Sequence, residues 1–234
     1  MVSQRITFWL MIAVSFGTGA LDAATYLGME HIFGANMTGN VILVGLALAG
    51  SEHITLWGPL TALGGFAFGS WILGLILRRF PPKHGKDTAV IPVFWFIAVG
   101  MVAVTVLMSL LPLNESLMHA ATVAIGIFMG FQAIAARRVG VPDVSTVVIT
   151  STLSLLFSEA GRFWGGAKTA ATLRRLAAVI SMFLGAIAGA LLEHQALWWA
   201  MTVPAIILTG VALTLSLLRP ARVEDSPAKA LVSA

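Results

Sequence analysis

The sequence predicts an all-α fold, namely a polytopic helical membrane protein, from three observations. The chain of 234 residues is 58% hydrophobic and 10% charged, whereas soluble domains are about 25% charged. Several apolar runs approach the length of about 20 residues that an α-helix needs to cross a bilayer. The short segments of alternating polarity that build a membrane β-barrel do not occur in the sequence.

Six apolar segments are long enough to cross a membrane, and two are too short. The short segment 36–50 would cover only about 22 Å as a helix, less than the roughly 30 Å of a hydrocarbon core. The first span is too long, and its flank too poor in charge, for a cleaved signal peptide. Residues 158–175 are predicted to form a polar, basic connection, and the tail 219–234 to be disordered. The spans are 7–28, 56–77, 89–111, 117–136, 176–192 and 196–218, and the short segments are 36–50 and 144–157.

Basic residues decide whether the short segments cross. If all eight segments cross, eight basic residues lie on one side of the membrane and six on the other. If both short segments enter and leave on one side, all fourteen lie beside the N-terminus. The opposite loops then carry only Glu30, Glu52, Glu115 and Glu193 as charges. Because cytoplasmic loops are enriched in Lys and Arg, we expect six spans, two re-entrant half-helices and cytoplasmic termini.

An inverted repeat follows from this arrangement. Each half reads span, half-helix, span, span, and three crossings turn the second half upside down relative to the first. The predicted units are residues 1–112 and 113–218, followed by the cytoplasmic tail. Shortened apolar segments at matching places in two halves are typical of solute sites in transporters.

Polar residues at membrane depth are the candidate site. Asp22 is the one acid well inside a span, and such residues are functional candidates. It could exchange a proton, or it could accept hydrogen bonds from amides near Asn36. The half-helix residues could line a solute path or only cap their helices, and Gln132 could meet Asp22 or bond between helices. The predicted solute-binding set is Asp22, Asn36, Thr38, Asn40, Gln132, Ser145, Thr146 and Thr150.

Two motifs carry a resemblance to a known family. The first is Gly19-x-x-Asp22-Ala23 followed by Phe33-x-Ala35-Asn36-Met37-Thr38-Gly39-Asn40. The second runs from Gly130-Phe131-Gln132-Ala133 to Arg137 and then from Thr146 to Thr150, where Ser151 stands in place of the family's glycine after a threonine. Together they resemble the YoaK-like family of small bacterial inner-membrane proteins, which contain a domain of unknown function. The resemblance implies six spans and an inner-membrane location, and it implies no activity.

The leading function is a transporter or facilitator for a small polar or anionic solute, with a solute channel as the runner-up. A scaffold or sensor that transports nothing is the third hypothesis. The sequence has no cysteine, paired acids, phosphate loop or metal-ligand spacing, so we expect no enzyme, cofactor or metal. The net charge of +4 comes from basic residues at span ends and does not indicate nucleic-acid binding. The expected partners are the lipid bilayer and the solute. Stripes of Gly-x-x-x-Gly favour close packing within one chain, with association between copies as the alternative.

Overall fold

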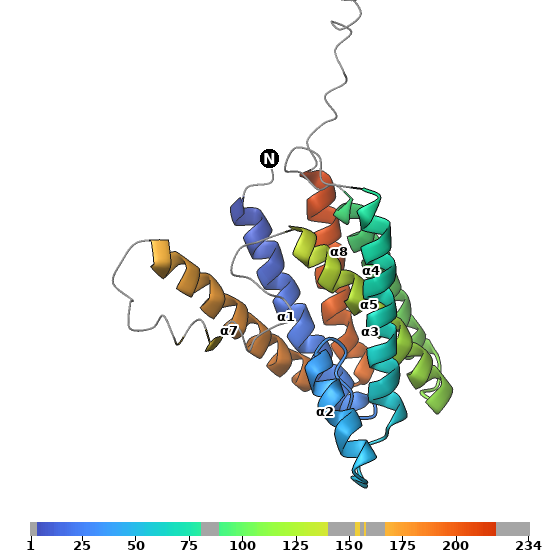
Figure 1. The fold of residues 1–234 in the computed structure, drawn as a ribbon. Coiled ribbons are helices and arrows are strands. Elements are labelled where there is room, and N and C mark those ends of the chain that lie inside the picture. The colour runs from blue at the N-terminus through green and yellow to red at the C-terminus, as the bar shows by residue number, and fades with distance from the viewer. Residues whose placement is uncertain (1–3, 81–88, 140–152, 155–156, 158–166, 219–234) are drawn as a thin grey trace, which may run out of the picture.

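The computed structural model describes residues 4–80, 89–139, 153–154, 157 and 167–218 (Figure 1). These residues are helical with connecting turns and contain no strand, and six of the helices are long and apolar enough to span a membrane. The all-α prediction is therefore confirmed, and each of the six predicted spans corresponds to a helix long and apolar enough to cross a membrane. The helices are α1 (Gln4–Gly28), α2 (Met37–Leu48), α3 (Trp57–Arg78), α4 (Val90–Leu110), α5 (Glu115–Val139), α7 (Ala167–Glu193) and α8 (Leu197–Leu217).

One predicted boundary is wrong, and two predicted segments cannot be compared. Helix α7 begins at Ala167, so the predicted polar connection over 158–175 is helical from residue 167 onward. Alanines and Leu173 in this stretch favour a helix, and the long stems of Arg174 and Arg175 let a helix continue while their charged ends stay near the interface. Most of the second short segment, 144–157, and the tail from residue 219 lie outside the described residues.

The helices pack in two similar groups that meet along α4 and α8 (Figure 1). Helix α1 contacts α7 and α8, while α3 contacts α5, and α5 also contacts α4. Helix α2 lies against α3. The buried core is continuous across the groups and includes Phe94, Ile97 and Met101 of α4 and Met201 of α8.

Glycines set the closest helix contacts. A methyl group at Gly65 or Gly69 of α3 would overlap the backbone carbonyls of Val123 or Ile127 in α5. Gly185 of α7 stands in the same relation to a carbonyl of α1. The Gly-x-x-x-Gly stripes therefore pack helices within one chain, because small residues let backbones approach closely.

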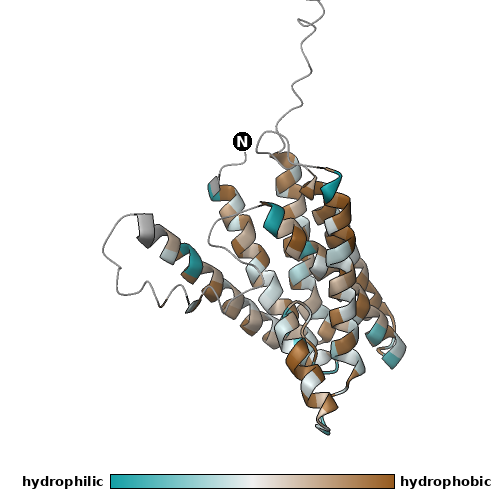
Figure 2. Cartoon of the chain, viewed as in Figure 1, coloured by the Kyte–Doolittle hydropathy of each residue, from teal (hydrophilic) through white to brown (hydrophobic). Residues whose placement is uncertain are grey.

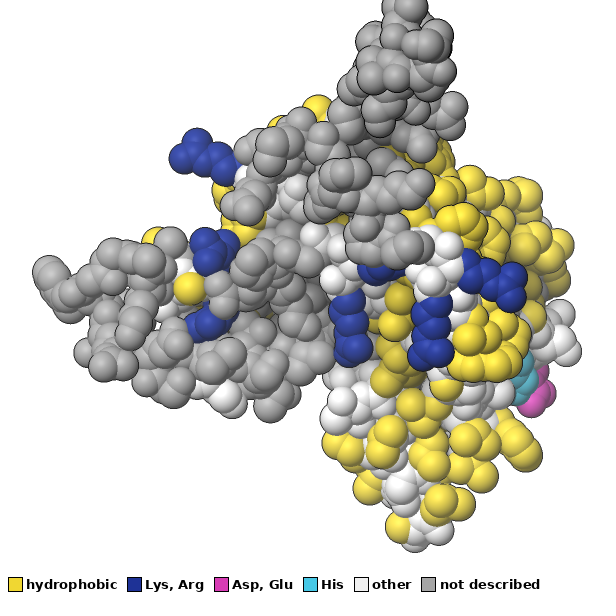
Figure 3. All heavy atoms as spheres, turned by 45° about the horizontal axis from the view of Figure 1, so that its top comes forward, with side chains coloured by type: hydrophobic (Ala, Val, Ile, Leu, Met, Phe, Trp, Pro, Cys, Tyr) yellow, Lys and Arg dark blue, Asp and Glu magenta, His cyan; other side chains and the backbone are white. Residues whose placement is uncertain are grey.

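The two ends of the bundle differ in charge. Arginines occur near the starts of α1 and α7 and the ends of α3 and α5, and Figure 3 shows arginine side chains gathered on the end that is uppermost in Figure 1. Arg138 joins two of these elements by donating to the carbonyls of Leu77 and Phe80 at 2.6 and 2.7 Å. Apolar residues cover the helices between the ends (Figure 2). This distribution agrees with the charge pattern used to count the spans.

Candidate functional site

Asp22 lies inside α1 and holds the chain that leads into α2. Its Oδ1 accepts hydrogen bonds from the backbone N–H groups of Ala35 at 2.7 Å and Asn36 at 3.1 Å. The residue is 6% exposed, and its Oδ2 has no hydrogen-bond partner among the residues that the structure describes. One carboxyl oxygen therefore holds the turn before α2, which is the structural role that the sequence analysis gave as an alternative. The other oxygen makes no hydrogen bond to a described residue.

Asn40 and Thr25 hold the same turn from either side. The Asn40 side chain is fully buried, accepts from the N–H of Phe33 at 2.9 Å and donates to the carbonyl of Phe33 at 2.7 Å. Thr25 accepts from the N–H of Gly34 at 2.9 Å and donates to the carbonyl of Leu21. The turn is therefore held by two side chains of α1, Asp22 and Thr25, and by one side chain of α2, Asn40.

Three of the first amides of α2 have partners within the chain. Asn36 caps the helix by accepting from the N–H of Gly39 at 3.3 Å, and the N–H groups of Met37 and Asn40 donate to backbone carbonyls. The N-terminal end of a helix carries partial positive charge and attracts anions. Here the Asp22 carboxyl already lies beside that end, so an anionic solute would have to displace a group of the protein.

The remaining predicted residues do not join Asp22. Thr38 is exposed on α2. Gln132 of α5 donates from Nε2 to the hydroxyl of Thr18 at 3.1 Å, one helical turn before Asp22, so the structure gives Gln132 an interhelical bond and not a direct contact with the acid. Ser145, Thr146 and Thr150 lie outside the described residues.

A buried polar stripe on α1 was missed by the sequence analysis. Ser15, Thr18, Asp22 and Thr25 are all at most 6% exposed, and their spacing of three, four and three places them on one face of the helix. The three hydroxyls donate to carbonyls four residues earlier at 2.9–3.0 Å. They therefore offer only lone pairs to their surroundings. The spacing was visible in the sequence, but such hydroxyls are common in membrane helices.

A recess lies beside this stripe, between α1, α5 and α8. Thr18 and Gln132 are its polar wall residues, and the walls leave no space for a water molecule in this conformation. The recess is therefore closed as it stands. Its lining consists of Val14, Gly17, Thr18, Leu21, Met129, Gln132, Pro204, Ile207 and Leu208.

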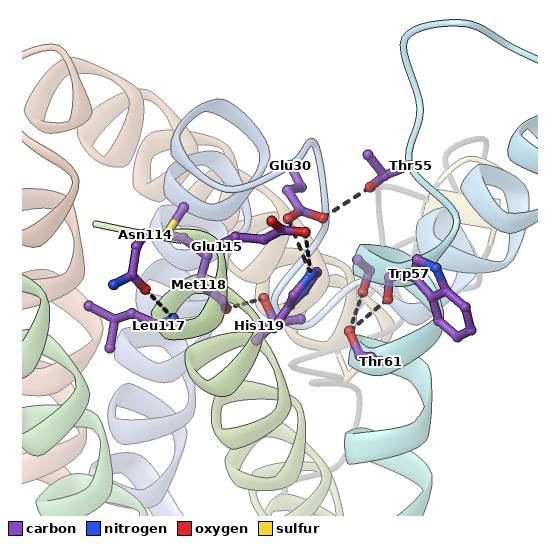
Figure 4. Close-up of polar contacts among 11 residues, drawn as sticks. Glu30, Thr55, Trp57, Thr61, Asn114, Glu115, Leu117, Met118 and His119 are labelled. Carbon is purple, nitrogen blue, oxygen red and sulfur yellow. Dashed lines mark hydrogen bonds and ion pairs between the residues drawn. The ribbon is translucent and has the colours of Figure 1, made fainter. Parts of the chain in front are cut away.

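At the opposite end from the arginines, Glu30 connects three elements (Figure 4). Its Oε2 accepts from the hydroxyl of Thr55 at 3.0 Å, and its Oε1 lies 3.8 Å from Nε2 of His119 in α5. Glu115 lies 3.7 Å from the same nitrogen. Glu30 and His31 have φ of 31° and 54°, values that residues other than glycine adopt rarely. The tight turn after α1 is thus fixed to α3 and α5 by polar contacts.

The comparisons with known proteins agree with this architecture. Residues 10–214 match the family described as "Protein of unknown function (DUF1275)". The chain belongs to this family. It is also 31% identical over 218 residues to the "UPF0700 transmembrane protein YoaK" of Bacillus subtilis (strain 168), with 89% of this chain and 93% of that protein covered.

The family resemblance predicted from the two motifs is therefore confirmed. Together with the six apolar helices, it makes the chain a multi-pass bacterial membrane protein. No solved structure gives a significant match.

Proposed function

We propose that the protein is a membrane transporter or facilitator for a small polar solute, with Asp22 at the centre of its solute path. The observation that supports this is the unpartnered Oδ2 of a buried carboxyl in a membrane-spanning helix. Bracing the turn requires only an acceptor for the N–H groups of Ala35 and Asn36, and asparagine would supply one without an ionisable group. An acid in this position is costly, and its second oxygen has no structural task.

The packing supports the inverted repeat that transport by alternating access would use. Gly19 of α1 faces the backbone of Met182 and Ala186 in α7, and Gly126 of α5 faces the backbone of Ala62 and Phe66 in α3. The first contact maps onto the second when α1 is exchanged for α5 and α7 for α3.

Neighbouring contacts keep the same register. Phe16 and Ala20 meet Gly185 and Gly189, just as Val123 and Ile127 meet Gly65 and Gly69. The same exchange replaces α4 with α8. The contact of α4 with α5 then corresponds to the contact of α8 with α1. Repeats related in this way typically place a solute site near the membrane midplane, between the halves.

The re-entrant character of α2 is part of the same proposal. Asp22 precedes the end of α1 at Gly28 by six residues, which is about 9 Å along a helix. The hydrogen bonds from the amides of Ala35 and Asn36 to Asp22 support a return of the chain toward the membrane interior before α2 begins. Helix α2 has 12 residues, or about 18 Å, and it leads into α3 without crossing. A break in helical structure at membrane depth is tolerated when it is buried in protein or lines a cavity.

The direct test is to follow solute distribution in cells that produce the wild type or Asp22→Asn. The matched control is Thr122→Val, because Thr122 is 4% exposed on α5 and donates only to the carbonyl of Met118. At equal protein amounts in the membrane, untargeted metabolite profiling of cells and medium should find a solute whose partition is shifted by wild type and Thr122→Val. Asp22→Asn should abolish that shift. If all three strains show the same metabolite distribution as cells without the protein, the transport proposal is wrong.

The scaffold alternative is favoured by one observation. The amides of residues 33–37, 39 and 40 all have partners within the chain. Under that alternative the polar turn is only a brace, and Asp22→Asn would behave like wild type in every assay except stability.

A further inference from the structure

We propose that the free oxygen of Asp22 binds a small inorganic cation, either a proton or an alkali metal ion. This inference deepens the proposed transport function and concerns the same site. It assigns to the site a class of ligand, a cation, that differs from the anion expected at the start of a half-helix.

The first step is the state of the Asp22 carboxyl. The Asp22 side chain is buried, and its Oδ2 is shielded from solvent and has no hydrogen-bond partner in the described part of the chain. An unpaired charge removed from water is very unfavourable. A bound cation on Oδ2 neutralises the carboxylate, while Oδ1 keeps its two bonds to the turn.

The second step concerns the neighbouring groups, which offer acceptors and few donors. The hydroxyls of Ser15, Thr18 and Thr25 donate their hydrogens to backbone carbonyls of α1. The amides of residues 35–37, 39 and 40 donate to Oδ1 of Asp22, to the Asn36 side chain or to backbone carbonyls. Thr18 and Thr25, each about one turn from Asp22 on the same face of α1, therefore present oxygen lone pairs and no free hydroxyl hydrogen, which favours a cation over an anion.

The third step concerns the ends of the bundle. Glu30 and Glu115 lie at the end where α1 turns back toward α2, and the described arginines occur near the other end. Like-signed charges at the mouth of a path raise the local concentration of ions of opposite sign. The acidic end therefore favours the approach of a cation toward Asp22.

The fourth step limits the size of the cation. The recess beside Thr18 and Gln132 has no space for a water molecule, and Oδ2 itself is enclosed. An organic ammonium ion would need a cavity that the closed conformation lacks. A proton needs no cavity, and a sodium or potassium ion, which is at most about the size of a water molecule, would need the walls to open by less than an organic cation does.

The test uses the purified full-length protein in detergent, without any solute. Unfolding temperatures are measured in sodium, potassium and N-methylglucamine chloride at equal ionic strength, and as a function of pH in the last of these. A ligand that binds only the folded state raises the unfolding temperature, by about 3–6 °C at ten times its Kd for a chain of this length, and by more at higher concentrations. We expect such a rise either with an alkali cation at fixed pH or on acidification alone, and the two arms identify the cation.

Variants assign the effect to Asp22. The rise should persist in Thr122→Val and disappear in Asp22→Asn, which keeps an acceptor for the turn but cannot bind a cation on its amide nitrogen. If Asp22→Asn does not fold, Asp22→Glu replaces it, because glutamate keeps the charge and changes its reach, and the midpoint of the cation effect should shift. A wild type that unfolds at the same temperature in all salts and shows the same pH dependence as the Asp22 variant overturns the inference.

Failure of this inference is distinguishable from failure of the transport proposal. If a cation stabilises the protein through Asp22 but no solute changes its distribution in cells, the cation site stands and the transport proposal is wrong. If the distribution of a solute depends on Asp22 but no cation affects the purified protein, the transport proposal stands and the cation inference is wrong.

Discussion

Replacing Asn40 with alanine tests the clamp that holds the turn before α2. The Asn40 amide is fully buried and satisfies both the N–H and the carbonyl of Phe33, at 2.9 and 2.7 Å. Alanine removes both bonds from the part-buried N–H and carbonyl of Phe33. The net contribution of one such hydrogen bond is about 0.5–1.5 kcal/mol, so loss of both should destabilise the protein by about 1–3 kcal/mol.

The matched control is Asn114→Ala. Asn114 is exposed, and its side chain accepts one bond, from the N–H of Leu117 at 2.9 Å, at the start of α5. Water can replace that bond, and loss of an exposed cap costs about 1 kcal/mol. Thermal unfolding of both variants in one detergent can be followed by the fluorescence of the seven tryptophans. If Asn40→Ala unfolds no earlier than Asn114→Ala, the turn does not depend on the clamp and the reasoning fails.

Three further predictions follow from the same geometry. A cysteine introduced at His53 of this cysteine-free chain should react with an impermeant label outside intact cells, and one at Lys83 should not; external labelling at Lys83 would restore eight crossings. Gly69→Ala should lower the unfolding temperature, because its methyl group would overlap a backbone carbonyl of α5, whereas Gly74→Ala on the same helix meets nothing and should be neutral or stabilising. Equal effects would contradict the close packing. Thr38→Val should leave stability unchanged because Thr38 is exposed, and a loss of solute partition in this variant would place Thr38 on the path.

The spans could be predicted from the sequence because a helix that crosses a bilayer needs about 20 apolar residues in a row, which is easy to recognise. Spans over 56–77, 89–111 and 196–218 agree closely with α3, α4 and α8. The start of α7 was misplaced because charge was taken as the end of the membrane segment. Helices continue beyond the hydrocarbon core, and Arg174 and Arg175 lie within one.

The site was only partly predictable, because the sequence shows which residues are polar but not where their bonds go. One of the two alternatives for Asp22 was that it accepts hydrogen bonds from amides near Asn36, and its Oδ1 does accept from the N–H groups of Ala35 and Asn36. Asn40 was predicted either to line a solute path or only to hold the half-helix, and the structure bonds both ends of its amide to Phe33, seven residues earlier. That pairing depends on a turn whose shape no local pattern specifies.

Asn40 and Asp22 also show how bracing and binding can be told apart in one turn. Both side chains are buried and both hold backbone groups, but the amide of Asn40 uses its oxygen and its nitrogen for Phe33. Asp22 uses one oxygen for two amides and keeps the other without a partner. A residue chosen only to brace would have both polar ends bonded, because an unpaired buried group weakens the fold. The surplus oxygen of Asp22 is therefore the feature that a purely structural account leaves unexplained, and the comparison of Asp22→Asn with Asn40→Ala separates the two roles. The first variant should lose the response to cations while it keeps the turn, and the second should lose the turn itself.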